Sequence, residues 1–451
     1  MEVLQPTSPA YDDGAPACAG DAAPTRTGGG APAPLPRRRG HLVVFGLLAT
    51  VGPGLMVMLA DTDAGSVVTA AQSGADWGYS MLPLEVLLVP VLYLVMELTS
   101  RLGLATGKGH ASLMADCFGR RWAVASVALL LVTTTGALVT ELAGLSSVAA
   151  MEGVPPGVSV PAAAVFLALV VRLGTYRRVE RVGVLLGLCE LAFVVAAIAA
   201  HPGIGPIAHS FVATAPVGRP GYLPMVAANI GAVVMPWMVY YQQSAVVDKG
   251  WGPADLRRAR TDTAIGAVVT QVVMVAVLVA AGSALAGAGR AGGGRFANLT
   301  SVAAISNALT PSLGRVGGRI AFEVGMAGAA LVAAIVVSLA AAWAFSDLYG
   351  RRGSLNASAR RAPVFYGIYF ASLALAAAIA LVSGAGPEVA LAVEVGNALL
   401  LPLVLGSLLV LSHRALPVPH RLPPWRVVVT SAVVAAAVAL NAALVLGALG
   451  L

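Results

Sequence analysis

The chain has 451 residues, of which 58% are apolar and only 11% are charged, whereas soluble domains carry about 25% charged residues. This deficit excludes an ordinary soluble enzyme. The formal net charge is +7, but the basic residues lie in short clusters between long apolar runs, which argues against a nucleic-acid partner. Eleven of these runs approach or exceed the roughly 18 residues that cross a lipid bilayer. The sequence therefore predicts an all-α polytopic membrane protein.

The N-terminal segment differs from the rest of the chain. Residues 1–40 are rich in Gly, Ala, Pro, Asp and Thr and contain almost no large apolar residue. This composition is typical of a disordered tail and lacks the apolar core of a signal peptide. We therefore expect a disordered cytoplasmic tail over residues 1–40, followed by a transmembrane domain over residues 41–451 whose first span inserts without cleavage.

The apolar runs predict eleven spans, of which the first and the sixth are interrupted. They cover residues 41–75, 79–100, 121–148, 157–173, 182–200, 222–247, 262–287, 318–345, 363–383, 388–412 and 427–450. Short cytoplasmic loops collect Lys and Arg. With the N-terminus inside, the inner segments hold all but five of the 28 basic residues. We therefore expect a plasma-membrane protein with a cytoplasmic N-terminus and an extracellular C-terminus.

Polar residues interrupt the first and sixth spans. The first contains Asp61, Thr62, Asp63, Gly65 and Ser66 within six residues, and in the sixth Pro236 is followed by Trp237, Tyr240, Tyr241, Gln242 and Gln243. A helix in hydrocarbon breaks only where protein or a water-filled cavity receives the freed backbone groups. Broken helices at equivalent places in two five-helix halves indicate an inverted-repeat transporter with a midplane site. We therefore predict a LeuT-like fold with repeats at about 41–200 and 222–412 and one extra helix.

The broken segments favour a cation as the transported ligand. Unwound backbone exposes carbonyl oxygens, and the carboxylates of Asp61 and Asp63 add negative charge. Two acids at membrane depth are costly enough to indicate a function, although either could simply cap the second half-helix. Oxygen ligands suit Mg²⁺, Ca²⁺ or Mn²⁺, whereas the thioether of Met235 suits softer metals. The ion would be cargo, and no resident cofactor is expected.

Other titratable residues in the spans are weaker candidates. Glu85 and Glu97 lie toward the ends of the second span, where water can reach them and a solvated or structural role is expected. Glu141 and Glu394 lie deeper and are candidate pathway groups, with structural hydrogen bonding as the alternative. Two further acids, Glu190 and Glu323, have no neighbouring motif and receive no role. All six histidines fall at span ends or in loops, which excludes a histidine proton relay at the midplane.

Three segments of the chain resemble the Nramp divalent-metal transporters. The stretch from Gly52-Pro53 through Asp63-Ala64-Gly65-Ser66 looks like the first helix of that family, Ala232-Val233-Val234-Met235-Pro236 is similar to its AxxMP segment, and Val139-Thr140-Glu141-Leu142-Ala143 resembles its ATDLAE segment. The resemblance implies metal ligands at Asp63, Ser66, Ala232 and Met235, to which we add Asp61. The pathway candidates are Trp237, Gln242, Glu141 and Glu394.

The chain departs from the Nramp pattern at three positions. Ser66 replaces the Asn of the family's DPGN motif, Trp237 replaces the His that follows Met-Pro, and Gly144 replaces the second acid of ATDLAE. The last two changes remove groups associated with proton movement, as in the Nramp-related magnesium transporters, which implies Mg²⁺ or Mn²⁺ transport without proton coupling. The shorter Ser66 leaves room for a hydrated Mg²⁺, whereas Met235 favours Mn²⁺ or Fe²⁺.

Three alternatives remain open at this stage. A proton-coupled Mn²⁺/Fe²⁺ importer would need a proton path that the chain lacks at Trp237 and Gly144. An amino-acid symporter on the same fold would present half-helix N-termini to a substrate carboxylate, which Asp61 and Asp63 would repel. A membrane-embedded enzyme is disfavoured because the spans contain no catalytic spacing. The expected partners are a divalent ion and the lipid bilayer, and the oligomeric state is left open.

Overall fold

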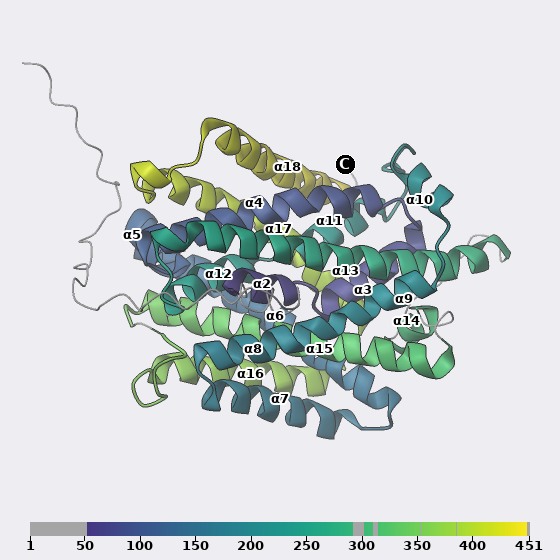
Figure 1. Ribbon diagram of the computed structural model, residues 1–451, viewed down its shortest axis with the longest axis horizontal. Coiled ribbons are helices and arrows are strands. Elements are labelled where there is room, and N and C mark those ends of the chain that lie inside the picture. The colour runs from purple at the N-terminus through teal and green to yellow at the C-terminus, as the bar shows by residue number, and fades with distance from the viewer. Residues whose placement is uncertain (1–51, 292–301, 310–313, 352, 385, 449–451) are drawn as a thin grey trace, which may run out of the picture.

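The computed structural model describes residues 52–291, 302–309, 314–351, 353–384 and 386–448, and within them it contains helices but no strand (Figure 1). The predicted tail and residues 41–51 of the first predicted span lie outside the described residues. Within the described part of the chain, nine helical segments are long and apolar enough to cross a membrane. The broken first span and the apolar part of the last helix, Pro424–Leu440, complete the eleven predicted spans.

The two interrupted spans are each divided into two helices. The first consists of α2 (Pro53–Leu59) and α3 (Ala64–Trp77), and the sixth of α11 (Tyr222–Val233) and α12 (Pro236–Asp248). The break in the sixth span therefore lies directly before Pro236. The reason is local: proline is favoured at the first position of a helix, and the residue before it is extended, as Met235 is with φ −94° and ψ 142°.

The remaining spans are α4 (Leu82–Thr106), α6 (Arg120–Met151), α7 (Pro156–Leu173), α8 (Tyr176–Gly187) with η1 (Leu188–Glu190) and α9 (Leu191–Ala199), α13 (Leu256–Ala291), α15 (Arg315–Leu348), α16 (Pro363–Ser383), α17 (Pro387–Arg414) and α18 (Pro424–Ala448). Short helices in the connections are α5 (His110–Phe118), α10 (Ile204–Ser210), η2 (Pro253–Asp255), α14 (Val302–Leu309) and η4 (Val418–His420).

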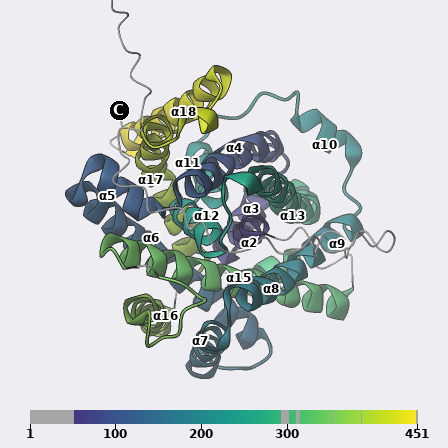
Figure 2. The ribbon, with the colours of Figure 1, turned by 60° about the vertical axis from the view of Figure 1, so that its left-hand side comes forward.

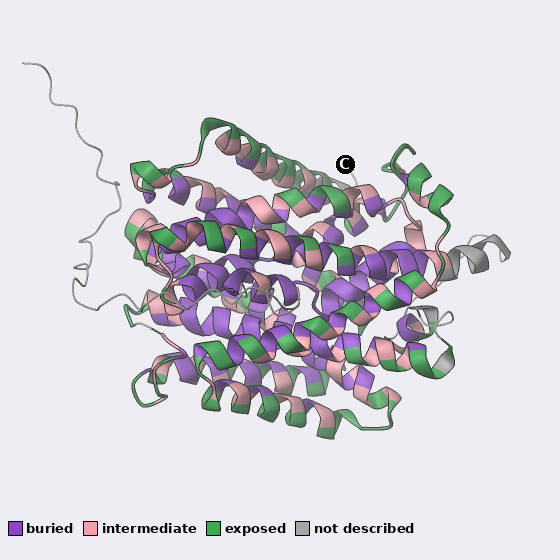
Figure 3. Cartoon of the chain, in the orientation of Figure 1, coloured by how far each residue is buried: buried purple, intermediate pink, exposed green. Residues whose placement is uncertain are grey.

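The broken helices lie in the middle of the bundle. Figures 1 and 2 show α2, α3 and α12 enclosed by α6, α13, α15 and α17. In Figure 3 the buried residues concentrate on these central helices and the exposed ones on peripheral helices such as α7 and α18. The most apolar window of α15 is 83% buried, whereas that of α7 is only 17% buried. An apolar helix that protein does not cover must face lipid, so α7 belongs to the lipid-exposed rim.

The bundle has two ends of different charge. One end, here called the basic face, is formed by α5 and by the connections at residues 174–175, 249–255, 349–351 and 353–362; the opposite face carries α10 and α14 (Figure 1). Most of the Lys and Arg residues of the connections lie on the basic face.

One prediction about the second span is wrong. Glu85 and Glu97 do not reach water, since the exposed fractions of their side chains are 0% and 1%. Glu97 instead bonds to three guanidinium groups, those of Arg101, Arg260 and Arg426. These arginines lie on α4, α13 and α18, so the buried carboxylate joins three helices at the basic face.

Candidate functional site

The first break places Asp63 at the start of α3. After Ala60 the chain leaves the helical hydrogen-bond pattern, and Asp63 adopts an extended conformation with φ −74° and ψ 178°. Its Oδ1 accepts a hydrogen bond from the Ser66 backbone N–H at 2.7 Å, which is the interaction expected of a helix N-cap. The carboxylate therefore caps α3.

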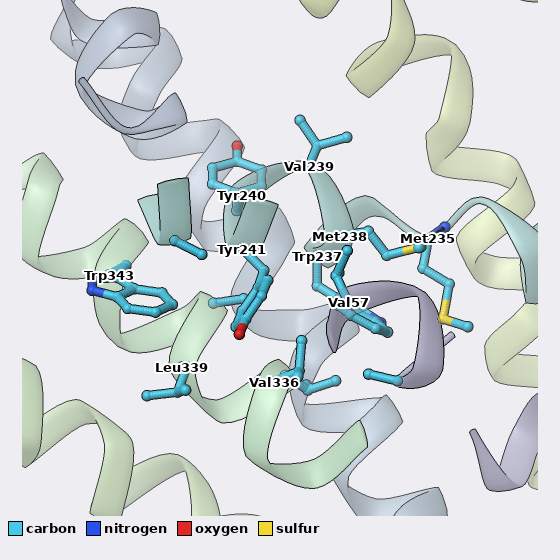
Figure 4. Packing of buried hydrophobic residues seen from close by; sticks show 14 of the residues in the cluster. Val57, Met235, Trp237, Met238, Val239, Tyr240, Tyr241, Val336, Leu339 and Trp343 are labelled. Atoms are coloured by element: carbon cyan, nitrogen blue, oxygen red, sulfur yellow. Dashed lines mark hydrogen bonds between the residues drawn. The ribbon is translucent and has the colours of Figure 1, made fainter. Parts of the chain in front are cut away.

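The two breaks meet at a single hydrogen bond. The Ser66 hydroxyl donates to the carbonyl oxygen of Ala232 at 3.0 Å, across 166 residues of sequence. Ala232 lies in the last turn of α11, where carbonyl groups lack partners within the helix. Met235 follows in the extended break and is fully buried. Figure 4 shows its side chain beside Met238 at the start of α12, with Val57 of α2 close by.

Two of the predicted pathway acids reach this junction. Glu141 of α6 accepts a hydrogen bond from the Ala64 backbone N–H through Oε2 at 3.1 Å. Glu394 of α17 lies so close to Gly65 that a Cβ atom there would be 2.4 Å from Oε1. Asp63, Glu141 and Glu394 are all buried. Three carboxylates from three helices thus surround the first turn of α3.

The other predicted site residues point elsewhere. Asp61 faces α13, where the Thr270 hydroxyl donates to its Oδ2 at 3.4 Å. Gln242 donates to the Ser100 hydroxyl of α4 at 2.6 Å. Trp237 is fully buried in α12, in the apolar cluster drawn in Figure 4. The structure therefore brings together Asp63, Ser66 and Ala232 but not Asp61 or Gln242.

Gly144, which stands where the Nramp ATDLAE segment has its second acid, is tightly packed. A Cβ atom on Gly144 would lie 2.8 Å from the Ala64 Cβ and 3.4 Å from the Met326 Cε. Both distances are shorter than comfortable carbon–carbon contacts. A carboxylate side chain at residue 144 would therefore require α3 and α6 to move apart.

One histidine packs against α12. His110, at the start of α5, is within hydrogen-bond distance of Gln243, with Nδ1 and Oε1 3.1 Å apart, and its ring contacts Tyr240 edge-on at 4.7 Å between centroids. Burial lowers the pKa of His110 to about 4. The imidazole is consequently neutral at physiological pH and does not change charge there.

The junction is enclosed on both sides. A cavity of about 390 Å³ opens at the basic face, lined among others by Lys108, Ser244 and Asp248. A pocket of only about 20 Å³, lined by Ala64, Gly144 and Pro387, approaches from the other side. Because Asp63 and Ser66 are themselves buried, the structure represents a closed state of the site.

A metal at this junction would need ligands of mixed chemistry. Within the described ranges, no group of three or more His, Cys, Asp and Glu side chains has an arrangement that could hold a metal ion. Carbonyl oxygens such as that of Ala232, the Met235 thioether or water would have to complete the shell beside Asp63. Carbonyl oxygens and water are usual ligands of Mg²⁺ and Mn²⁺, whereas a thioether suits softer metals.

Several buried polar residues near the breaks escaped sequence reasoning. Asp262 of α13 accepts hydrogen bonds from the backbone N–H groups of Gly52 and Gly54 at 2.8 and 2.7 Å. Thr270 bonds to Thr62, and Glu190 is fully buried in η1. In the sequence each of these residues is visible only as a polar residue inside an apolar run, and this pattern does not show which residue it contacts.

Comparison with known proteins agrees with this architecture. The family model described as natural resistance-associated macrophage protein-like (Nramp) matches residues 54–447. The divalent metal cation transporter MntH of Brucella suis is 28% identical over 251 residues, or 52% of this chain and 54% of MntH. MntH of Klebsiella pneumoniae is 28% identical over 246 residues, or 52% and 59% of the two chains. The chain thus spans a little over half the length of these curated relatives.

Solved structures extend the likeness to most of the fold. A manganese transporter of Eremococcus coleocola superposes with a TM-score of 0.70 at 19% identity, covering 90% of this chain and 87% of the other. Mhp1, a nucleobase-cation-symport-1 family transporter, superposes with a TM-score of 0.52 at 13% identity, covering 81% and 79%. These superpositions confirm the predicted LeuT-like fold class. Since the family model covers most of the chain, the protein belongs to the Nramp family.

Proposed function

We propose that the protein moves divalent metal ions, Mg²⁺ or Mn²⁺, across the membrane by alternating access. The observation that carries the proposal is the junction of the two breaks, where the Asp63 carboxylate, the Ser66 hydroxyl and the Ala232 carbonyl meet at the centre of the bundle. Broken helices with polar groups at this depth are the arrangement in which transporters hold ions. The relatives named above, MntH and a manganese transporter, support a divalent ion.

The proposed ligands follow from the geometry. Asp63 supplies the negative charge, Ala232 a carbonyl oxygen, and Met235 a thioether three residues further along the sixth span. Ser66 already donates its proton to Ala232, so its oxygen lone pairs face away from that bond and can accept or ligate. Glu141 and Glu394 place two further carboxyl groups around the first turn of α3, and carboxyl oxygens are common ligands of hard divalent ions.

Transport without proton coupling is the version that the residues favour. Trp237 carries no titratable group, and Ala64 packs so close to Gly144 that an acidic side chain would not fit there. His110 is neutral in the physiological pH range. The competing proposal is a proton-coupled Mn²⁺ importer; the manganese transporter of Eremococcus coleocola supports the choice of Mn²⁺. In that case a carboxylate such as Glu141 would have to move the proton.

The same charges speak against an amino-acid substrate. Three buried carboxylates, Asp63, Glu141 and Glu394, surround the start of α3. A substrate carboxylate placed there would meet like charges in a medium of low dielectric constant.

We further propose that the basic face is cytoplasmic and that the protein resides in the plasma membrane, because basic residues are retained on the cytoplasmic side.

Metal uptake into proteoliposomes tests the proposal. Wild-type protein should carry Mn²⁺ or Mg²⁺ down its gradient, and Asp63→Ala should abolish uptake because the principal anionic ligand is gone. Asp76→Ala is the matched control, since Asp76 lies on the same helix far from the break. Near wild-type flux in Asp63→Ala, or equal loss in both variants, would contradict a site at Asp63.

A further inference from the structure

The short helix α2 is held against α13 in a regular register. Met58 packs into Gly266, where a Cβ atom would lie 2.7 Å from the Met58 Cγ. One turn beyond Gly266 on α13, the hydroxyl oxygen of Thr270 lies 2.7 Å from that of Thr62, which belongs to the unwound segment after α2. A step of four residues keeps side chains on the same face of a helix. The register therefore directs the end of α2 to Thr270.

A second register on the other side leads to Glu190. Met56 and Leu59 pack into Gly183 and Gly187 of α8, where Cβ atoms would lie 2.6 Å from their nearest atoms. One further helical step on α8 reaches Glu190, the last residue of η1. Figure 2 shows α2 lying between α13 and α8. The broken end of the first span is thus enclosed by Thr270 on one side and by Glu190 on the other.

The carboxylates in this place lack compensating charge. Glu190 is fully buried; the Thr62 hydroxyl lies close to its carboxyl group, but neither carboxyl oxygen has a hydrogen-bond partner of good geometry. Asp61 is also fully buried and its Oδ1 has none, and it lies within electrostatic range of Glu190. The ion pairs found in the described part of the chain involve neither residue. Unpaired carboxylates at membrane depth are costly and indicate a bound ion or another function.

The irregular geometry of η1 is an independent pointer. Between α8 and α9 the chain adopts a 3₁₀ turn over Leu188–Glu190, and such turns inside a helix often mark a functional hinge. The turn ends at the one buried acid of this span that faces the break. Structural packing alone would be served by an apolar residue there.

We propose that Asp61, Thr62, Thr270 and Glu190 bind a second cation, Na⁺, on the side of the break opposite to the divalent site. The available ligands are all oxygens, which suits a hard ion. The site is buried, and the cost of stripping water from an ion rises with the square of its charge, so a monovalent ion pays about a quarter of the penalty of a divalent ion of the same size. Because Asp61 and Asp63 flank one unwound segment, Na⁺ occupancy would couple to metal transport. The coupling rests on the proposed function, but the binding does not.

Thermal unfolding of the purified full-length protein in detergent tests the binding. The unfolding midpoint should rise saturably with NaCl and much less with KCl or N-methyl-D-glucamine chloride at equal ionic strength, in the absence of divalent ions. Thr270→Val and Glu190→Gln should raise the half-saturating Na⁺ concentration by about tenfold or more, as expected for losing one polar contact to a charge. Thr270→Ser should retain the Na⁺ response.

Two controls separate this proposal from the proposed function. Thr99→Val removes a buried hydroxyl that bonds to its own helix at Val95, so it should leave the Na⁺ response unchanged. Asp63→Ala should lose metal uptake but keep the Na⁺ response. Equal midpoints in Na⁺ and N-methyl-D-glucamine, or an unchanged Na⁺ response in both Thr270→Val and Glu190→Gln, would overturn the second site whatever the fate of metal transport.

Discussion

Asp262 should control whether α2 stays docked in the bundle. The first backbone N–H groups of any helix lack partners within it, and the N-cap of α2 is Gly52, which has no side chain to supply one. Asp262 of α13 takes this role from outside, accepting from Gly52 and Gly54 at 2.8 and 2.7 Å. We therefore predict that Asp262→Ala loosens α2 while the rest of the fold is retained.

The magnitude follows from the number of donors left without a partner. Two buried N–H groups each lose a hydrogen bond to the Asp262 carboxyl group, at about 1–3 kcal/mol each, so local opening of α2 should become easier by about 2–6 kcal/mol. Asp262→Asn keeps one acceptor oxygen and should show about half of this effect. At 1.4 kcal/mol per factor of ten, even the lower bound corresponds to roughly a 30-fold faster exchange of the α2 amides.

Hydrogen–deuterium exchange measured by mass spectrometry is the assay. Peptides that cover residues 53–60 should lose protection in Asp262→Ala, whereas peptides from α15 should not. Asp255→Ala is the control because Asp255 accepts from Gly252 in the same connection without bonding to α2. Unchanged exchange in α2, or the same change in the control, would refute the role assigned to Asp262.

Three further predictions follow from the site and the basic face. Met235→Ala should leave Mg²⁺ transport largely intact and weaken Mn²⁺ or Cd²⁺ transport, because only a dehydrated, softer ion gains from sulfur. Ser66→Asn should shift the preference toward Mn²⁺. Uptake with Mg²⁺ and Mn²⁺ in competition checks both variants, and equal loss of both ions in Met235→Ala without a shift in Ser66→Asn would refute a hydrated ion. Metal entry should not acidify proteoliposomes loaded with a pH dye, and Trp237→His alone should not create acidification; a proton influx that tracks wild-type metal entry would contradict this. Glu97→Gln should destabilise the protein by about 3 kcal/mol or more in denaturant titrations, because it leaves the buried Arg101 guanidinium without its carboxylate. Glu152→Gln removes an exposed pair with Arg319 and should cost less than about 1 kcal/mol; equal effects of the two substitutions would be inconsistent with a buried ion pair at Glu97.

The membrane fold could be predicted because it depends on local patterns. Apolar runs report spans directly, and a polar group such as Asp61 to Ser66 in such a run reports a break without any knowledge of its neighbours. The exact position of the break beside Pro236 was not predicted, although it agrees with the preference of proline for the first position of a helix. The eleven spans and the two breaks are therefore properties of single segments.

The partners of buried polar residues could not be predicted in the same way. Glu97 bonds to arginines 4, 163 and 329 residues away, and the sequence shows only the first of these as a neighbour. Asp61 and Asp63 are equivalent by composition, yet Asp61 bonds to Thr270 and Asp63 to the first turn of α3. Which face each carboxylate takes depends on the packing of α2 against α13 and α8, which is a tertiary property.

The central claim is that a divalent ion binds where the two broken helices meet, and anomalous diffraction from crystals soaked in Mn²⁺ tests it most directly. The account predicts a strong manganese peak beside the Asp63 carboxylate, within coordination distance of the Ala232 carbonyl oxygen, and no such peak in Asp63→Ala crystals. A peak that contacts neither Asp63 nor Ala232, or one that persists unchanged in Asp63→Ala, would contradict it.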